Sequence, residues 1–267
     1  MVVVWAVAVA TAARAQAPEV ELSAVPEYAA VRPGAAFRVA VRLRLPPGWH
    51  IYWINPGAGG LPTTIAWHLP AGVTGGDTDW PYPETDDAGG DVSNVYRGTV
   101  VLFSSFAAGP DIAGRVALSA DLVWGMCKVQ CVRQERTVGV SLPVSRAAKA
   151  PTLAWDQVVL ALRALSVSVH ADRLHAAVSG DSVRLVISGL PAGPMAGSWL
   201  TFFPLEPGKA SVVAEARAAH GGVAIVLPRT VVSGEPAGRL SGVLVAAHAP
   251  GAQPPVRPLA VDVAVGE

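Results

Sequence analysis

Apolar and polar residues alternate with a period of two along much of the chain, and this alternation predicts β-strands. In the segment 37–45 every second residue is apolar, and most of the residues between them are arginine. Because successive side chains of a strand point to opposite faces, this segment is expected to be a strand with one buried face. The first half has further segments of strand character at 49–54, 63–69, 96–107, 116–126 and 132–144.

Proline and glycine mark the expected breaks between these strands. Pro46-Pro47-Gly48 ends the first strand, and Asn55-Pro56-Gly57 is predicted to close the second as a turn. The segment 70–94 is predicted to be a long loop. It contains the acidic, glycine-rich run 86–91, whose spacing does not match a calcium-binding loop. Short strands joined by turns in this way are typical of an antiparallel β-sandwich.

The second half repeats the pattern and predicts a second sandwich. Strands are expected at 183–187, 199–205, 212–219, 223–227, 242–247 and 259–265, with a hairpin turn at 220–222. The fold class is therefore predicted to be all-β, with tandem β-sandwich domains at 18–148 and 167–267. The linker at 149–166 includes a short helix with Thr152 as its N-cap. The second domain has no cysteine, and we expect it to have a structural or docking role.

Residues 1–17 have the features of a signal peptide. Val2 to Ala10 is an apolar run too short to span a bilayer, and small-x-small cleavage sites end at Ala15 and Ala17. The basic residues that normally precede such a run are missing, and a buried N-terminal strand is the alternative. The sequence predicts an exported, soluble protein of the periplasm, an oxidising compartment.

Composition agrees with a globular protein and excludes one class of partner. Half of the residues (51%) are hydrophobic, 15% are charged, and the formal net charge is zero. No basic patch is present that could hold nucleic acid, so nucleic-acid binding is not expected. The 27 glycines and 23 prolines suit many short strands and turns better than a helical bundle.

Cys127 and Cys131 are the chain's two cysteines, and their spacing restricts the local geometry. Four residues of straight strand span roughly 13 Å, whereas a disulfide needs Cα atoms about 4.4–6.8 Å apart. A hairpin with residues 128–130 as its loop would place the cysteines opposite each other, and a single helical turn would also serve. The alternation on both sides favours the hairpin. Gln134 and Arg136 then fall on the buried parity, which requires an open face or a bulge.

Three roles for the cysteine pair follow from the residues. Both cysteines have the parity of the polar, accessible face, beside Lys128 and Arg133, whose charges favour a thiolate. A disulfide that closes so short a loop adds only about 2 kcal/mol of stability. A redox-active pair is therefore favoured over a structural disulfide. Metal ligation with His50 or His68 is the third possibility, although these histidines lie on separate predicted strands.

Several motifs resemble the periplasmic N-terminal region of bacterial DsbD/ScsB-type protein-disulfide reductases. They are the segments 48–57 (GWHIYWINPG), 60–63 (GLPT), 80–84 (WPYPE), 124–131 (WGMCKVQC) and 200–208 (LTFFPLEPG). The resemblance implies immunoglobulin-like folds and a catalytic dithiol formed by Cys127 and Cys131. It also implies an aromatic cap over the pair, which we expect between Tyr82 and Tyr96.

The same resemblance implies a function in thiol:disulfide interchange. The pair would take electrons from a membrane-embedded thiol reductase and pass them to periplasmic thioredoxin-like proteins, without a cofactor or metal. Cys131 is expected to attack first, because Arg133 follows it on the same face. The chain ends at Glu267 without a transmembrane region or a thioredoxin-like domain, so it is expected to be a fragment or a separately encoded relay. The alternatives are a copper- or metal-handling protein and a non-catalytic binding module with a structural disulfide.

Overall fold

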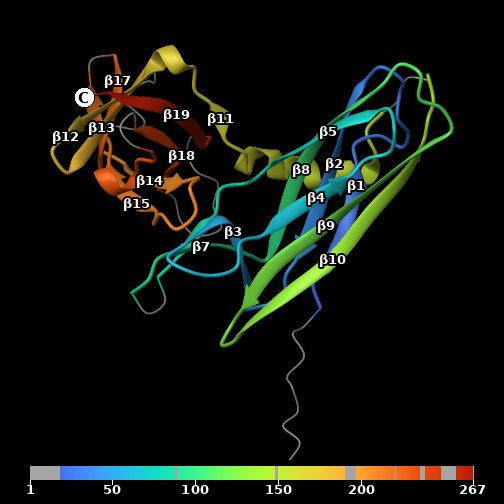
Figure 1. Ribbon diagram of the computed structural model, residues 1–267, viewed down its shortest axis with the longest axis horizontal. Helices are drawn as coiled ribbons and strands as arrows, with labels where there is room; N and C mark the ends of the chain where they lie inside the picture. Colours follow the sequence, from blue (N-terminus) through green and yellow to red (C-terminus); the bar gives the residue numbers. More distant parts are fainter. Residues whose placement is uncertain are drawn as a thin grey trace, which may run out of the picture.

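The structure is a computed structural model that describes residues 19–87, 90–147, 150–189, 197–219, 221–234, 238–247 and 257–266. The predicted signal peptide at 1–17 lies outside these residues. The molecule has two lobes, one built from the strands before α1 and the other from the strands after it (Figure 1). Almost all of the regular structure is β, as predicted.

Two antiparallel sheets form the N-terminal lobe. The first has the order β1-β2-β8-β5, with β1 at Glu21–Pro26, β2 at Ala36–Arg44, β8 at Thr99–Ala108 and β5 at Val73–Asp79. The second has the order β10-β9-β3-β7-β6, with β10 at Cys131–Pro143, β9 at Arg115–Cys127, β3 at His50–Gly57, β7 at Ser93–Arg97 and β6 at Glu84–Asp86. Strand β4 (Thr64–His68) also pairs with β9.

The core of this lobe forms where the apolar faces of the two sheets meet. Val41 and Leu43 of β2 pack in one cluster with Leu122 and Trp124 of β9, and all four side chains are buried. The predicted alternation of β2 is thus confirmed for its inner face. Its outer face is covered only at the middle of the strand, where Ala40 packs in one cluster with Trp155 of the helix α1 (Leu153–Val158).

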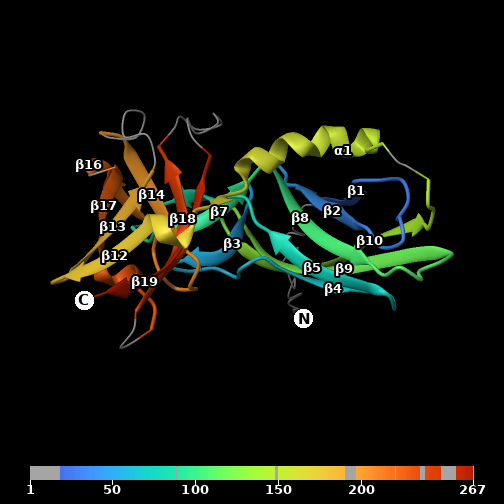
Figure 2. The ribbon, with the colours of Figure 1, turned by 90° about the horizontal axis from the view of Figure 1, so that it is seen from above.

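Helix α1 and the following 3₁₀ helix η1 (Val159–Ala164) lie along the outer face of the first sheet (Figure 2). The helix begins as the sequence predicts, because the Thr152 hydroxyl accepts a hydrogen bond from the Trp155 backbone N–H at 3.0 Å. The same hydroxyl donates to the Pro26 carbonyl at 2.9 Å and so fixes the start of the helix to β1.

Three predicted boundaries in this lobe are wrong. Residues 55–57 belong to β3, and the chain turns only after Gly57, whose φ of 78° glycine adopts without strain. The expected loop 70–94 contains β5, β6 and the start of β7. Strand β5 is at the edge of its sheet and buries only Val73, so its polar sequence carries no alternation. The expected strand 96–107 is broken at Gly98, where φ is 64°.

Among the described residues, nine strands form the C-terminal lobe in the path β15-β14-β18-β19-β12-β13-β17-β16, with β11 beside β19. Their bounds are Val167–Ser168 (β11), Leu174–Ser179 (β12), Ser182–Ser188 (β13), Trp199–Pro204 (β14), Val212–Glu215 (β15), Arg217–Ala219 (β16), Gly222–Pro228 (β17), Arg239–Ala246 (β18) and Leu259–Gly266 (β19). Strands from both ends of this path contribute side chains to one apolar core, which includes Leu185, Phe202 and Ile225. Strands β16 and β17 pair on either side of the predicted hairpin turn, whose His220 lies outside the described residues.

The two lobes share part of one hydrophobic core. Phe203 of β14 and Val245 of β18 belong to the same buried cluster as Trp53 of β3 and Trp124 of β9. The rings of Trp53 and Phe203 meet edge to face, with centroids 6.1 Å apart. Among the residues that the structure describes, no helix is long and apolar enough to cross a membrane.

Candidate functional site

The two cysteines lie at the tip of the hairpin formed by β9 and β10. Cys127 is the register partner of Cys131, and the pairing continues without a shift to Arg115 and Pro143. The two sulfurs form a disulfide, and the Cα atoms are 4.1 Å apart. The predicted hairpin is therefore confirmed, and the alternative of a helical turn is wrong. Because the register does not shift, a bulge does not explain the polar residues on this parity: Arg136 is exposed and pairs with Glu19 at 3.5 Å, whereas Gln134 is partly buried.

The two cysteines differ in their access to solvent. Cys131 is exposed, as expected from its parity, but Cys127 is only 4% exposed, which contradicts the prediction that both face outward. The reason is the third strand at this place. Strand β3 pairs with the end of β9, with His50 opposite Cys127. Tyr52 of β3 and Val95 of β7 then pack with Cys127 in a small buried cluster.

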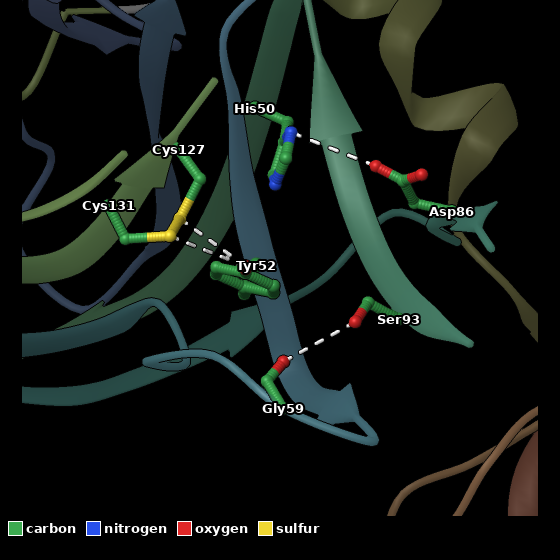
Figure 3. Close-up of a disulfide and its surroundings, with 7 residues drawn as sticks. All are labelled: His50, Tyr52, Gly59, Asp86, Ser93, Cys127 and Cys131. Carbon is green, nitrogen blue, oxygen red and sulfur yellow. Dashed lines mark hydrogen bonds and ion pairs between the residues drawn. A yellow bond between two sulfur atoms is a disulfide. The ribbon is translucent and has the colours of Figure 1, made fainter. Parts of the chain in front are cut away.

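Tyr52 is the aromatic residue that covers the disulfide. Its hydroxyl donates to Cys127 Sγ at 3.3 Å and lies 4.0 Å from Cys131 Sγ (Figure 3). Burial, and secondarily the negative charge of Asp86, raises the pKa of Tyr52 above its usual value of 10.0, so the hydroxyl stays a donor at neutral pH. Gly60 packs against the ring so closely that a Cβ at this position would lie 2.3 Å from it.

A second layer of polar groups surrounds Tyr52. The ring of His50 meets the Tyr52 ring edge to face at 5.4 Å, and His50 Nδ1 lies 3.8 Å from Asp86 Oδ2 (Figure 3). Arg97 donates to the same carboxylate at 2.5 Å. Burial and the Arg97 charge lower the pKa of His50 below 6.5, and Asp86 opposes this only in part. His50 is therefore neutral at pH 7.

The expected cap between Tyr82 and Tyr96 does not provide the aromatic ring over the disulfide. Tyr96 is buried in the core, where its hydroxyl donates to the Pro81 carbonyl at 2.6 Å. Tyr82 lines a cavity of about 570 Å³ between the lobes. The region does contribute Val95, which packs on Cys127. It also contributes Asp86, whose negative charge acts to raise the pKa of both Tyr52 and His50.

The two histidines of the metal hypothesis lie in different places. His50 is next to the disulfide, whereas His68 of β4 pairs with Asp121 of β9 through Nε2 and Oδ2, 2.6 Å apart. Thr137 donates to the other oxygen of Asp121 at 2.5 Å. Within the described part of the chain, no three His, Cys, Asp or Glu residues are grouped so that they could hold a metal ion.

The surface around Cys131 combines apolar and basic groups. Val129, at the tip of the hairpin, is 94% exposed, and Leu61 is also exposed on the neighbouring segment, where its carbonyl accepts from the Gly125 N–H at 3.2 Å. Arg133 forms an ion pair with Glu135 at 2.8 Å, which offsets much of the charge that was expected to favour a thiolate at Cys131. The hairpin thus presents one exposed cysteine beside apolar side chains.

This geometry is suited to thiol–disulfide exchange. In such a reaction a thiolate attacks one sulfur of a disulfide, and the other sulfur leaves as a thiolate. Cys131 is the exposed cysteine of the pair and so the one that a partner's thiolate can approach. Cys127 Sγ is covered, and it has a hydroxyl donor in place that would stabilise a negative charge there.

Comparison with known proteins finds one family model that matches most of the first lobe. Residues 19–142 match the family model described as "Thiol:disulfide interchange protein DsbD, N-terminal". The N-terminal periplasmic domain of ScsB from Proteus mirabilis has a similar fold over 91% of this chain and 92% of its own, with a TM-score of 0.58 and 17% sequence identity. The reduced DsbD N-terminal domain of Neisseria meningitidis is 19% identical over 48% of this chain and 90% of its own, with a TM-score of 0.27. None of the curated proteins compared with the chain matches it.

Proposed function

We propose that this chain, whose residues 19–142 match the family model of the DsbD N-terminal region, is a thiol:disulfide interchange protein of the periplasm that relays electrons through Cys127 and Cys131. The match to this family model supports thiol–disulfide interchange in general. The observation that supports the specific assignment is the asymmetry of the pair, in which Cys131 is exposed and Cys127 is buried beneath the Tyr52 hydroxyl. An inert structural disulfide has no need of such a donor.

The relay begins with reduction of the disulfide. A thiolate of an external dithiol attacks Cys131 Sγ, the S–S bond breaks, and its electron pair moves to Cys127 Sγ, where the Tyr52 hydroxyl stabilises the new thiolate. The second thiol of the donor, as a thiolate, then attacks the mixed disulfide at the donor's own sulfur. The donor leaves as a disulfide and the pair remains as a dithiol, having gained two electrons and two protons.

Transfer to the acceptor reverses these steps. The Cys131 thiolate attacks the acceptor disulfide, and one acceptor sulfur leaves with the electron pair. Cys127 then attacks Cys131 Sγ in the mixed disulfide, the Cys127–Cys131 bond forms again, and the acceptor is released as a dithiol. Cys131 is assigned the attacking role because it is exposed, and Cys127 the resolving role because it is buried.

The partners of the relay are proposed to be a membrane-embedded thiol reductase as donor and periplasmic thioredoxin-like proteins as acceptors. The exposed side chains of Val129 and Leu61 support a docking surface for a partner with apolar groups around its own cysteine. Such small contacts suit a relay, since transient redox complexes bury little surface and must separate after each exchange.

Trapping of mixed disulfides tests this proposal. In a Cys127→Ser variant the exposed Cys131 can still attack a partner, but nothing resolves the product, so a covalent complex with a thioredoxin-like protein should accumulate. In Cys131→Ser the remaining thiol is buried, and the yield should be much lower. The double Ser variant is the control for non-specific capture. Equal trapping by both single variants would contradict the assigned roles, and trapping by neither would contradict the relay.

A further inference from the structure

Asn55 joins the two lobes through every hydrogen-bonding group of its side chain. It is fully buried near the end of β3. Its Nδ2 donates to the carbonyls of Pro204 at 2.8 Å and Lys209 at 2.9 Å, both in the C-terminal lobe. Its Oδ1 accepts from the backbone N–H of Gly208 at 3.1 Å and of Gly57 at 2.9 Å. An amide has two donors and one oxygen with two lone pairs, so its capacity is filled.

The two carbonyls and the N–H group of the C-terminal lobe that bond to Asn55 come from one short segment, residues 204–209. This segment begins at Pro204, the last residue of β14, and includes the end of the motif 200–208 singled out in the sequence. Phe203, directly before this segment, packs edge to face on Trp53. The C-terminal lobe therefore holds β3 at both Trp53 and Asn55, on either side of Ile54.

From Asn55 the connection continues to the disulfide. Tyr52 lies three residues earlier on the same strand and donates to Cys127 Sγ. Through Gly57, Asn55 also fixes the start of the segment 57–63, which returns over the Tyr52 ring at Gly60. Thr63 at its end donates to the Tyr52 carbonyl at 2.5 Å. The position of the Tyr52 hydroxyl thus depends on a strand and a loop that both meet at Asn55.

The geometry points to Asn55 as a positioning residue through which the C-terminal lobe holds Tyr52 against the disulfide and thereby sets how easily the pair is reduced. This inference rests on the proposed function, and it assigns a role in that function to the second lobe. A hydrogen bond from Tyr52 stabilises a Cys127 thiolate more than it stabilises the disulfide, whose sulfur is a weak acceptor. Loosening β3 should therefore move the equilibrium toward the disulfide.

Equilibration of the full chain with glutathione buffers measures this effect. In Asn55→Ala the equilibrium constant should shift toward the disulfide by about threefold to tenfold, a part of what loss of a hydrogen bond to a charged group would cause. Val245→Ala is the control for a general loss of stability. The variant also removes packing between the lobes, but the Val245 side chain forms no hydrogen bond with β3. A constant like that of the wild type, or an equal shift in both variants, would overturn the inference.

A milder pair of variants decides the question if Asn55→Ala does not fold. Gly208 and Gly180 both have positive φ, of 83° and 61°, and an added Cβ would meet no atom within 4 Å at either. Alanine therefore introduces a similar backbone strain at both positions, but only Gly208 donates to Asn55. Gly208→Ala should shift the glutathione equilibrium toward the disulfide and Gly180→Ala should not. Equal constants in these two variants would overturn the inference.

The two proposals fail in different ways in this experiment. If the wild-type pair cannot be reduced by glutathione buffers at all, the proposed relay fails. If the wild-type pair exchanges normally and neither Asn55→Ala nor Gly208→Ala shifts the constant, only the role of Asn55 fails.

Discussion

Replacing Tyr52 with phenylalanine removes the hydroxyl above the disulfide and leaves the ring. The ring keeps its packing on Gly60 and in the cluster with Val95 and Cys127, so the fold should be retained. What is lost is the donor at 3.3 Å from Cys127 Sγ. Because this donor stabilises the reduced pair more than the disulfide, the reduction potential should fall.

The size of the change follows from the hydrogen bond. A hydrogen bond to a charged group contributes about 1.5–3 kcal/mol. For a two-electron couple, about 1.4 kcal/mol corresponds to 30 mV. Loss of the whole bond to a Cys127 thiolate would therefore lower the potential by about 30–60 mV, and a neutral thiol would show less because it is a weak acceptor.

The assay is equilibration in glutathione buffers of graded composition, followed by alkylation and counting of free thiols. Tyr28→Phe is the matched control, because Tyr28 packs in a different cluster of the same lobe. Its potential should equal that of the wild type. An unchanged or higher potential in Tyr52→Phe would refute the view that the hydroxyl favours the reduced pair.

Three further predictions concern the same site. After reduction, iodoacetamide should modify Cys131 much faster than Cys127, measured by peptide mass spectrometry, and equal rates would contradict the burial of Cys127. Val129→Ser should slow exchange with a thioredoxin-like partner about tenfold or less, because the variant loses the apolar contact of one small side chain with the partner. The free energy of unfolding should not change, because Val129 is 94% exposed. Burial and the charge of Arg97 lower the pKa of His50 in the folded protein, so the unfolded chain protonates this histidine at a higher pH than the folded chain does. The contribution of neutral His50 to the free energy of unfolding should therefore be fully present above pH 6.5. It should be lost as the pH falls through the folded pKa. Urea unfolding at several pH values should show this decline reduced in His50→Gln, and an equal decline in both proteins would contradict it.

The sequence predicts the hairpin of the site well, because its constraints are local. The spacing of Cys127 and Cys131 and the alternation on either side leave few geometries, and the register observed between β9 and β10 is one of them. The exposure of Cys127 could not be predicted in this way. It depends on β3, which is more than 70 residues away in the sequence and covers a face that is polar by parity.

Tyr52 was missed for a related reason. Ile51, Tyr52 and Trp53 are all buried, so β3 shows no alternation from which the direction of each side chain could be read. The signal that could have found it is this unbroken apolar run, which indicates a strand covered on both faces. Strand β5 was missed for the opposite reason, because Val73 is its only buried residue. Alternation identifies strands that have one buried face. It fails for strands with two buried faces and for strands with almost no buried residues.

The reduction potential of the Cys127–Cys131 pair in the wild-type chain tests the account most directly. A relay must be reduced by one partner and oxidised by another, so the account predicts a value of about −180 to −270 mV, the range of exchange proteins. It also predicts cooperative unfolding of the reduced protein, since a short-loop disulfide contributes only about 2 kcal/mol to stability. A potential well below about −300 mV, as in structural disulfides, or loss of cooperative folding on reduction would contradict the account.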